Sequence, residues 1–296
     1  MKKHLLSIIA LSCLSVLNAQ DKKDKWDVSN PPAEFKEIKY TTDEGTWMSL
    51  DVSPDGKEIV FDMMGDIYSM PIAGGDAKVL RQGLGFEVQP RFSPDGKKIA
   101  FTSDAGGGDN IWVMNRDGSD AKQITKESFR LLNNVAWMPD GNYLVAKKHF
   151  SSERSLGAGE LWMYHITGGS GEQLVKKKNE QQDIGEPAVS PDGRHIYFSQ
   201  DVYPGGYFQY NKDPNSQIYV INRYDRTTGE TERVTGGPGG AIRPQISHNG
   251  NYLAFIKRVR TKTVLYIHDL KTGEEWPVFD ELSKDQQEAW AIFGPY

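Results

Sequence analysis

Short apolar segments separated by turn-forming residues recur along this chain. One apolar triplet precedes each turn and two follow it, as Leu50–Val52, Ile59–Phe61 and Ile67–Met70 do around the first turn. A fourth, more polar segment (Lys78–Leu80) ends the unit. The turns are Ser-Pro-Asp-Gly at 53–56, 93–96 and 190–193, Met-Pro-Asp-Gly at 138–141 and Ser-His-Asn-Gly at 247–250. The pattern predicts repeated antiparallel hairpins of short β-strands.

The spacing of these turns predicts the fold. Successive copies are 40, 45, 52 and 57 residues apart. A four-stranded unit of that length is typical of one blade of a β-propeller. Apolar strands suit the buried positions of a blade, and a polar fourth strand suits its exposed edge. We therefore expect an all-β chain, a β-propeller of four-stranded blades.

The repeats set the expected organisation. Residues 35–45 are similar to an outer strand that closes the last blade, and residues 286–296 are similar to the start of a further blade. We expect about five blades of a six-bladed ring that is incomplete at the C-terminus. The five repeats cover about 46–85, 86–130, 131–183, 184–240 and 241–285.

The N-terminal residues predict export. Lys2 and Lys3 precede an apolar run from Leu5 to Leu17, which is too short to span a membrane. We expect a signal peptide at 1–19, a linker at 20–34 and a periplasmic or extracellular protein. Cys13 is the only cysteine, and the residues before it are a poor lipidation signal. A mature chain without cysteine has no disulfide and no thiol chemistry.

The net charge and the motifs argue against several classes of function. The net charge of −5 argues against a nucleic-acid partner, and no later segment is long and apolar enough to cross a membrane. The chain has no Gly-x-Ser-x-Gly elbow, no phosphate-binding loop, no EF-hand spacing and no His-x-His pair. We therefore expect no catalytic residue, metal or cofactor in this chain.

Two long insertions are the first candidate binding site. Strand direction places the tight turns on one face of the propeller and the insertions, His149–Gly159 and Asp201–Ser216, on the other. Long loops on a rigid scaffold often carry binding residues, although such loops also pack simply on their neighbours. The candidates are His149, Arg154, Tyr207, Gln209, Tyr210 and Lys212.

The central channel is the second candidate. Residues just before the inner strands should ring it, and converging charges there could bind a small polar ligand or an ion. The alternative is a water-filled channel with paired charges. The candidates are Glu87, Arg91, Asn134, Glu186 and Arg243.

The repeated turn, with Ile-Ala-Phe after it and Ile-Trp-Val-Met beyond, resembles the TolB-like propeller family over about residues 26–296. Segments 41–50, 106–112, 154–159 and 209–214 are similar to the N-terminal propeller of large secreted bacterial amidohydrolases. That resemblance implies a hydrolase domain beyond the propeller with a divalent metal such as zinc. The six histidines are scattered, so the resemblance places no metal site in this chain.

Three functions follow from this resemblance. The first is a non-catalytic propeller that scaffolds or controls access to a C-terminal hydrolase domain. The second is a stand-alone periplasmic propeller that binds another envelope protein. The third is the gating propeller of a peptidase similar to prolyl oligopeptidase.

Overall fold

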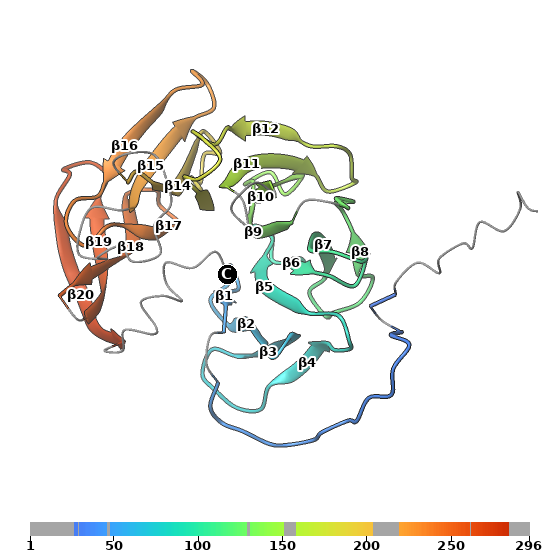
Figure 1. The fold of residues 1–296 in the computed structure, drawn as a ribbon. Helices are drawn as coiled ribbons and strands as arrows, with labels where there is room; N and C mark the ends of the chain where they lie inside the picture. Colours follow the sequence, from blue (N-terminus) through green and yellow to red (C-terminus); the bar gives the residue numbers. More distant parts are fainter. Residues whose placement is uncertain are drawn as a thin grey trace, which may run out of the picture.

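The computed structural model describes residues 27–28, 30–45, 48–128, 131–150, 158–203, 219–260 and 262–283. These residues form twenty strands and no helix. The strands make five four-stranded antiparallel sheets, arranged around a common centre (Figure 1). The prediction of an all-β propeller with four-stranded blades is confirmed.

Each blade uses four consecutive strands. The first two blades contain β1 (Leu50–Val52), β2 (Glu58–Met63), β3 (Asp66–Pro71) and β4 (Lys78–Arg81), then β5 (Glu87–Phe92), β6 (Lys98–Ser103), β7 (Asn110–Asn115) and β8 (Lys122–Gln123). The third contains β9 (Leu132–Trp137), β10 (Tyr143–Phe150), β11 (Ala158–His165) and β12 (Glu172–Val175). The last two contain β13 (Ile184–Val189), β14 (His195–Asp201), β15 (Tyr219–Asp225) and β16 (Thr231–Thr235), then β17 (Ile242–Ile246), β18 (Tyr252–Val259), β19 (Lys262–Asp269) and β20 (Glu275–Ser283).

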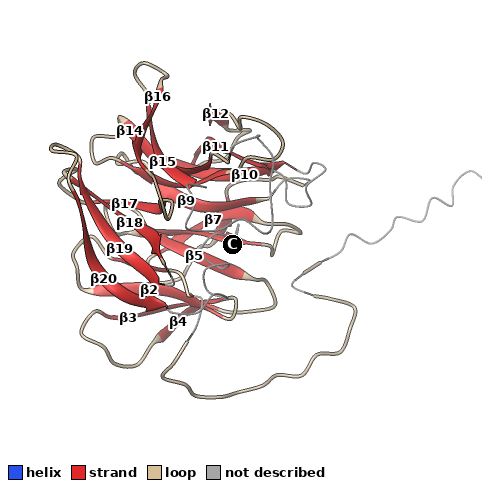
Figure 2. Ribbon diagram, turned by 60° about the vertical axis from the view of Figure 1, so that its left-hand side comes forward, coloured by secondary structure: helices blue, strands red, loops and turns tan. Residues whose placement is uncertain are grey.

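The hydrophobic core lies between neighbouring blades. Phe101 and Ile99 pack with Val60 and Ile67 of the first blade, and one such cluster fills each following boundary. Figure 2 shows the sheets stacked side by side with their strands roughly aligned. Each blade therefore depends on its neighbours for burial, as expected of a repeat architecture.

The Ser-Pro-Asp-Gly turns are held by their own side chains. The Ser93 hydroxyl lies 2.7 Å from an Asp95 carboxylate oxygen and accepts the Lys98 backbone N–H at 2.9 Å. The fifth turn keeps this geometry, because the Asn249 amide oxygen lies 2.7 Å from the Ser247 hydroxyl. An amide oxygen thus replaces the carboxylate, which explains why the degenerate copy still forms a turn.

The face with these turns is called the turn face. Because antiparallel strands alternate in direction, the β2–β3 and β4–β5 connections and their counterparts lie on the opposite face, called the loop face. Both predicted insertions follow a second strand of a blade, so they leave the sheets at the loop face.

The segment before the first repeat differs from expectation. Residues 35–45 are exposed and form no strand, and they run outside the sheets (Figure 1). A strand needs a hydrogen-bonded neighbour, and these residues pair with no sheet in the described part of the chain. The predicted signal peptide (1–19) and residues 286–296 lie outside the described residues. Within the described ranges no helix could cross a membrane.

The turn geometry predicts the effect of removing one hydroxyl. Ser93→Ala deprives the Lys98 N–H of its acceptor in a buried turn, so it should lower the free energy of unfolding by about 1–2 kcal/mol. Ser119→Ala, which removes an exposed hydroxyl bonded to Asp117, is the control and should cost less than about 0.5 kcal/mol. Urea unfolding measures both, and equal losses would contradict this explanation of the turn.

Candidate functional site

Five of the six candidate loop residues lie outside the described residues: Arg154, Tyr207, Gln209, Tyr210 and Lys212. The structure places only His149 among them, at the loop-face end of β10. Its surroundings show how this part of the face is built.

His149 ends a run of three consecutive basic residues, and all three are buried. The Lys147 ammonium lies 2.6 Å from a carboxylate oxygen of Asp183, just before β13 in the fourth blade. The Lys148 ammonium lies 2.6 Å from Glu127, which follows the second blade. Successive side chains of a strand point to opposite faces of the sheet. β10 is therefore tied by ion pairs to the blade on each side.

Two glycines make room for the Lys147 side chain. A Cβ atom on Gly159 would approach Lys147 to 2.5 Å, and one on Gly185 would approach it to 2.7 Å. The Gly159 N–H also donates to the second Asp183 carboxylate oxygen at 2.7 Å. This buried pair thus has the added hydrogen bond that a desolvated carboxylate requires.

The charge of Asp183 is stabilised by these contacts. Burial alone raises the pKa of its carboxyl, but the charges of Lys147 and His149 and the bond from Gly159 lower it below the ordinary value of 3.8. His149 places its Nε2 atom 3.2 Å from the Asn133 side-chain oxygen. This contact lies within the third blade, and the histidine sits near the interblade Lys147–Asp183 pair.

Aromatic rings cover the other side of β10. The Lys148 ammonium lies 4.0 Å from the centre of the Trp162 ring, and Trp162 Nε1 donates to Glu160 at 3.1 Å. The Lys177 ammonium lies 4.3 Å from the centre of the Phe150 ring. These cation–π contacts fix the edge of the third blade next to the first insertion.

The predicted channel residues Asn134, Glu186 and Arg243 occupy equivalent positions. Each has a left-handed backbone, with φ of 51°, 57° and 55°. Gln89, with φ of 59°, is their counterpart in the second blade. In each blade this position lies five residues before the second residue of the tight turn. Each lies at a β-bulge of an innermost strand.

Polar side chains of the preceding blade accept the N–H groups at three of these four bulges. The Gln89 N–H donates to Asp62 at 2.7 Å, and the Asn134 N–H donates to the Gln89 side-chain oxygen at 2.7 Å. The Arg243 N–H donates to Glu186 at 2.9 Å. We call these four residues with Asp62 the inner belt. It links three of the four boundaries between consecutive blades.

The other two channel candidates have different surroundings. Glu87 is buried and forms an ion pair with Arg81; burial raises the pKa of its carboxyl against the opposing effect of that pair. Arg91 donates to the backbone oxygens of Pro90 at 2.7 Å and Leu50 at 3.2 Å. The sequence interpretation chose Glu87 and Arg91 in the second blade and overlooked Gln89 between them; the constant offset from the turn identifies it.

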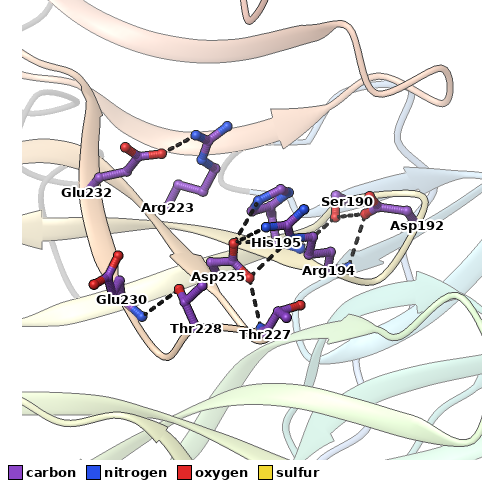
Figure 3. A network of polar contacts seen from close by, with 10 residues as sticks. All are labelled: Ser190, Asp192, Arg194, His195, Arg223, Asp225, Thr227, Thr228, Glu230 and Glu232. Carbon is purple, nitrogen blue, oxygen red and sulfur yellow. Dashed lines mark hydrogen bonds and ion pairs between the residues drawn. The ribbon is translucent and has the colours of Figure 1, made fainter.

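The turn face carries a separate polar network, drawn in Figure 3. Asp225 accepts from Arg194 at 2.7 Å and lies 3.7 Å from Nε2 of His195. Hydrogen bonds from Arg194 and the Thr227 backbone hold the pKa of Asp225 well below its usual range. The Ser190 hydroxyl bonds to Asp192 instead of the His195 ring. Serine, histidine and aspartate therefore do not form a proton relay here.

A metal site has no support in this geometry. Within the described ranges, no three histidine, cysteine, aspartate or glutamate side chains lie close enough together to hold an ion. The buried Lys147 and Lys148 at the loop-face end of β10 are instead paired with Asp183 and Glu127.

Comparisons with known proteins place the fold. The model of the Tricorn protease N-terminal β-propeller domain matches residues 51–158. Dipeptidyl-peptidase 5 of Porphyromonas endodontalis is 24% identical over 314 residues, which cover 88% of this chain and 44% of the relative. The Tol-Pal system protein TolB of Francisella tularensis subsp. mediasiatica is 27% identical over 211 residues, 69% of this chain and 44% of the relative.

A solved structure agrees. The putative TolB from Agrobacterium tumefaciens has a TM-score of 0.61 and 21% identity, covering 78% of this chain and 80% of that one. This chain has the fold of a TolB-like β-propeller. It spans less than half the length of the two curated relatives above.

The Lys147–Asp183 pair predicts a pH-dependent variant. Lys147→Met leaves a buried carboxylate unpaired, which should lower the free energy of unfolding by about 3–5 kcal/mol at pH 7. Because Lys147 lowers the pKa of Asp183 in the folded state, the pair stabilises the fold above about pH 3.8 and loses its effect as the pH falls through the lowered pKa.

The difference in the free energy of unfolding between Lys147→Met and the natural chain should therefore shrink as the pH falls below about 3.8. Lys97→Met, which removes an exposed pair with Asp95, is the control and should change stability little. Chemical unfolding at several pH values measures both. A cost for Lys147→Met that stays constant with pH would contradict the assigned pairing.

Proposed function

We propose that this chain is a non-catalytic β-propeller module of an exported protein, which presents its loop face to a hydrolase domain or to another envelope protein. The proposal rests on one observation: the buried charged side chains at the loop-face end of β10 form contacts between blades. Lys147 and Lys148 tie β10 to its two neighbours. Groups held in this way shape a surface and are poorly placed to react with a substrate.

Similar proteins support the proposal that the propeller is part of a longer protein. More than half of the dipeptidyl-peptidase 5 relative lies outside the aligned region, and a protease propeller model matches residues 51–158. We infer that the propeller belongs with a hydrolase domain, which would be a metal-dependent amidohydrolase according to segments 41–50, 106–112, 154–159 and 209–214. The described residues of this chain do not fit such a metal, so that domain would hold it.

Two other functions each have an observation in their favour. The alignment with dipeptidyl-peptidase 5 over 88% of this chain favours the gating propeller of a peptidase. The likeness to the putative TolB structure, of which 80% is covered, favours a stand-alone protein-binding propeller. Reading the coding region past codon 296 separates the three. His-x-His supports the amidohydrolase, Gly-x-Ser-x-Gly the peptidase, and a stop after one more blade the stand-alone protein.

We also propose that a sixth blade fills the space between the fifth and first blades. Tyr266 packs on the fourth blade, so the neighbouring Leu265 and Ile267 point away from it. In the first blade, Val60 and Ile67 pack on the second, so Phe61 and Tyr68 point away. All four outward side chains are only partly buried. Two such apolar faces suit a blade between them.

The proposal also includes export of the chain from the cytoplasm. The basic and apolar residues of 1–19 support a signal peptide and a periplasmic or extracellular location. Mass spectrometry of the secreted chain should find Gln20 as its first residue, and an uncleaved Met1 would contradict this.

A hydrolysis assay tests the non-catalytic function. The purified chain with Zn²⁺ should release no more product from peptide and amide substrates than a mock preparation from cells without the gene. Zn²⁺-dependent turnover that persists through further purification and is removed by a chelator would refute the proposal.

The sixth blade predicts a context-dependent effect of one substitution. Ile267→Ala should cost less than about 1 kcal/mol in this chain, where the face is partly open. It should cost about 2 kcal/mol or more in the protein read through to its stop codon, where the face would be buried. Ile221→Ala is the control, since Ile221 is already fully buried and should cost the same in both. Equal small costs of Ile267→Ala in both proteins would argue against a sixth blade.

A further inference from the structure

The β2–β3 hairpin has an unusual residue at its tip. Met63 pairs with Asp66, so Met64 and Gly65 form a two-residue turn with φ of 55° and 86°. Such turns favour asparagine, aspartate or glycine at the first position, because other side chains are strained there. Met64 is nevertheless 76% exposed. The Tyr40 hydroxyl donates to the Met64 sulfur, yet most of the Met64 side chain stays exposed, which points to a role on the surface.

Met64 shares the loop face of the first blade with two other exposed apolar residues. Phe86 is 57% exposed and Leu84 is 43% exposed, both in the β4–β5 connection. A Cβ atom on Gly65 would lie 2.7 Å from the Phe86 ring, so the hairpin tip and this ring are in contact. We call Met64, Leu84 and Phe86 the Met64 patch. Clustered exposed apolar side chains of this kind mark interaction sites.

Hydrogen bonds hold the Met64 patch in place. The Phe86 N–H donates to an Asp104 carboxylate oxygen at 2.7 Å, and the Gly83 N–H donates to Asp66 at 3.2 Å. The Glu87 N–H donates to the Gly65 carbonyl at 2.9 Å. The exposed ring is therefore presented from a fixed backbone. A preorganised aromatic anchor loses little conformational entropy when it binds.

The charges around the patch are negative. Asp66 and Asp104 make the bonds just described, and Asp109 lies in the same β6–β7 connection as Asp104. In the described part of the chain none of these three carboxylates forms an ion pair with a cation, and the nearby Arg81 is paired with Glu87. A partner that complements this surface would be positively charged around an apolar centre.

We propose that the Met64 patch is a docking point for a partner protein segment that carries basic side chains beside apolar ones. The inference rests on the proposed function, because it identifies where on the loop face a partner binds and what chemistry it presents. Apolar side chains of the segment would cover Met64, Leu84 and Phe86, and its basic groups would face Asp66, Asp104 and Asp109.

The test uses the whole mature chain and two labelled twelve-residue peptides. One contains lysine, leucine and tryptophan, and the other has glutamate in place of every lysine. Fluorescence anisotropy measures binding at low and at physiological salt. The lysine peptide should bind more tightly than the glutamate peptide, and more weakly as salt increases, because exposed charges are screened.

Three variants separate docking from folding. Phe86→Ser should weaken binding of the lysine peptide about tenfold, as expected when an aromatic anchor is removed. Met64→Asn should also weaken it, while raising the melting temperature by a few degrees, because asparagine is better suited to the left-handed turn position. Ile72→Ser removes a side chain 49% exposed on the turn-face side of the same blade and should leave binding unchanged.

Several outcomes would overturn the proposal. These are equal binding of the two peptides, an equal loss for Ile72→Ser, or normal binding by Met64→Asn and Phe86→Ser. Self-association of the chain that Met64→Asn abolishes would show that a second copy covers the patch instead. Zn²⁺-dependent hydrolysis by this chain would refute the proposed function and leave the peptide results standing, so the two failures are distinguishable.

Discussion

The backbone N–H at each inner bulge must find an acceptor outside its own strand, and the contacts between blades are arranged around that need. Gln89, Asn134 and Arg243 have left-handed conformations, and each donates its N–H to a side chain of the preceding blade. A buried N–H without a partner costs about 1–3 kcal/mol, and left-handed strain at a non-glycine residue adds a similar amount. When one blade packs correctly on the next, each of these N–H groups has its acceptor, and the cost of an unpaired N–H is avoided. The apolar clusters supply most of the stability, and the inner belt favours one register.

The boundary between the third and fourth blades carries an ion pair at the corresponding place. Lys147 follows its tight turn by the same number of residues as Asp62 and Ser199 follow theirs, so all three lie at corresponding places in the second strand. Asp62 and Ser199 accept N–H groups of the inner belt, whereas Lys147 pairs with Asp183. A buried ion pair adds little net stability compared with apolar packing, but a mispaired one is costly. This boundary therefore gains specificity at the edge where the first insertion leaves the sheet.

The strands and turns of the blades could be predicted from the sequence because their signals are local. Each tight turn and the apolar triplets beside it determine a hairpin, so the strands of every blade follow from the residues alone. Residues 35–45 also have a strand-like pattern, yet they form no strand, since pairing depends on a sheet edge that local sequence does not reveal. The burial of Lys147 and Lys148 was missed for a related reason: basic residues predict exposure, and only the positions of Glu127 and Asp183 in space explain their burial. The Met64 patch was likewise hidden, because its residues come from two connections.

Amide hydrogen exchange at Asn134 tests the role of the inner belt most directly. Its N–H donates to the Gln89 side chain and to no strand of its own sheet. We predict that this amide exchanges as slowly as core amides of β9 and β10, and that Gln89→Ala accelerates its exchange while the amide of Leu144, within the same blade, stays protected. Fast exchange at Asn134 in the natural chain, or unchanged exchange in Gln89→Ala, would contradict this role.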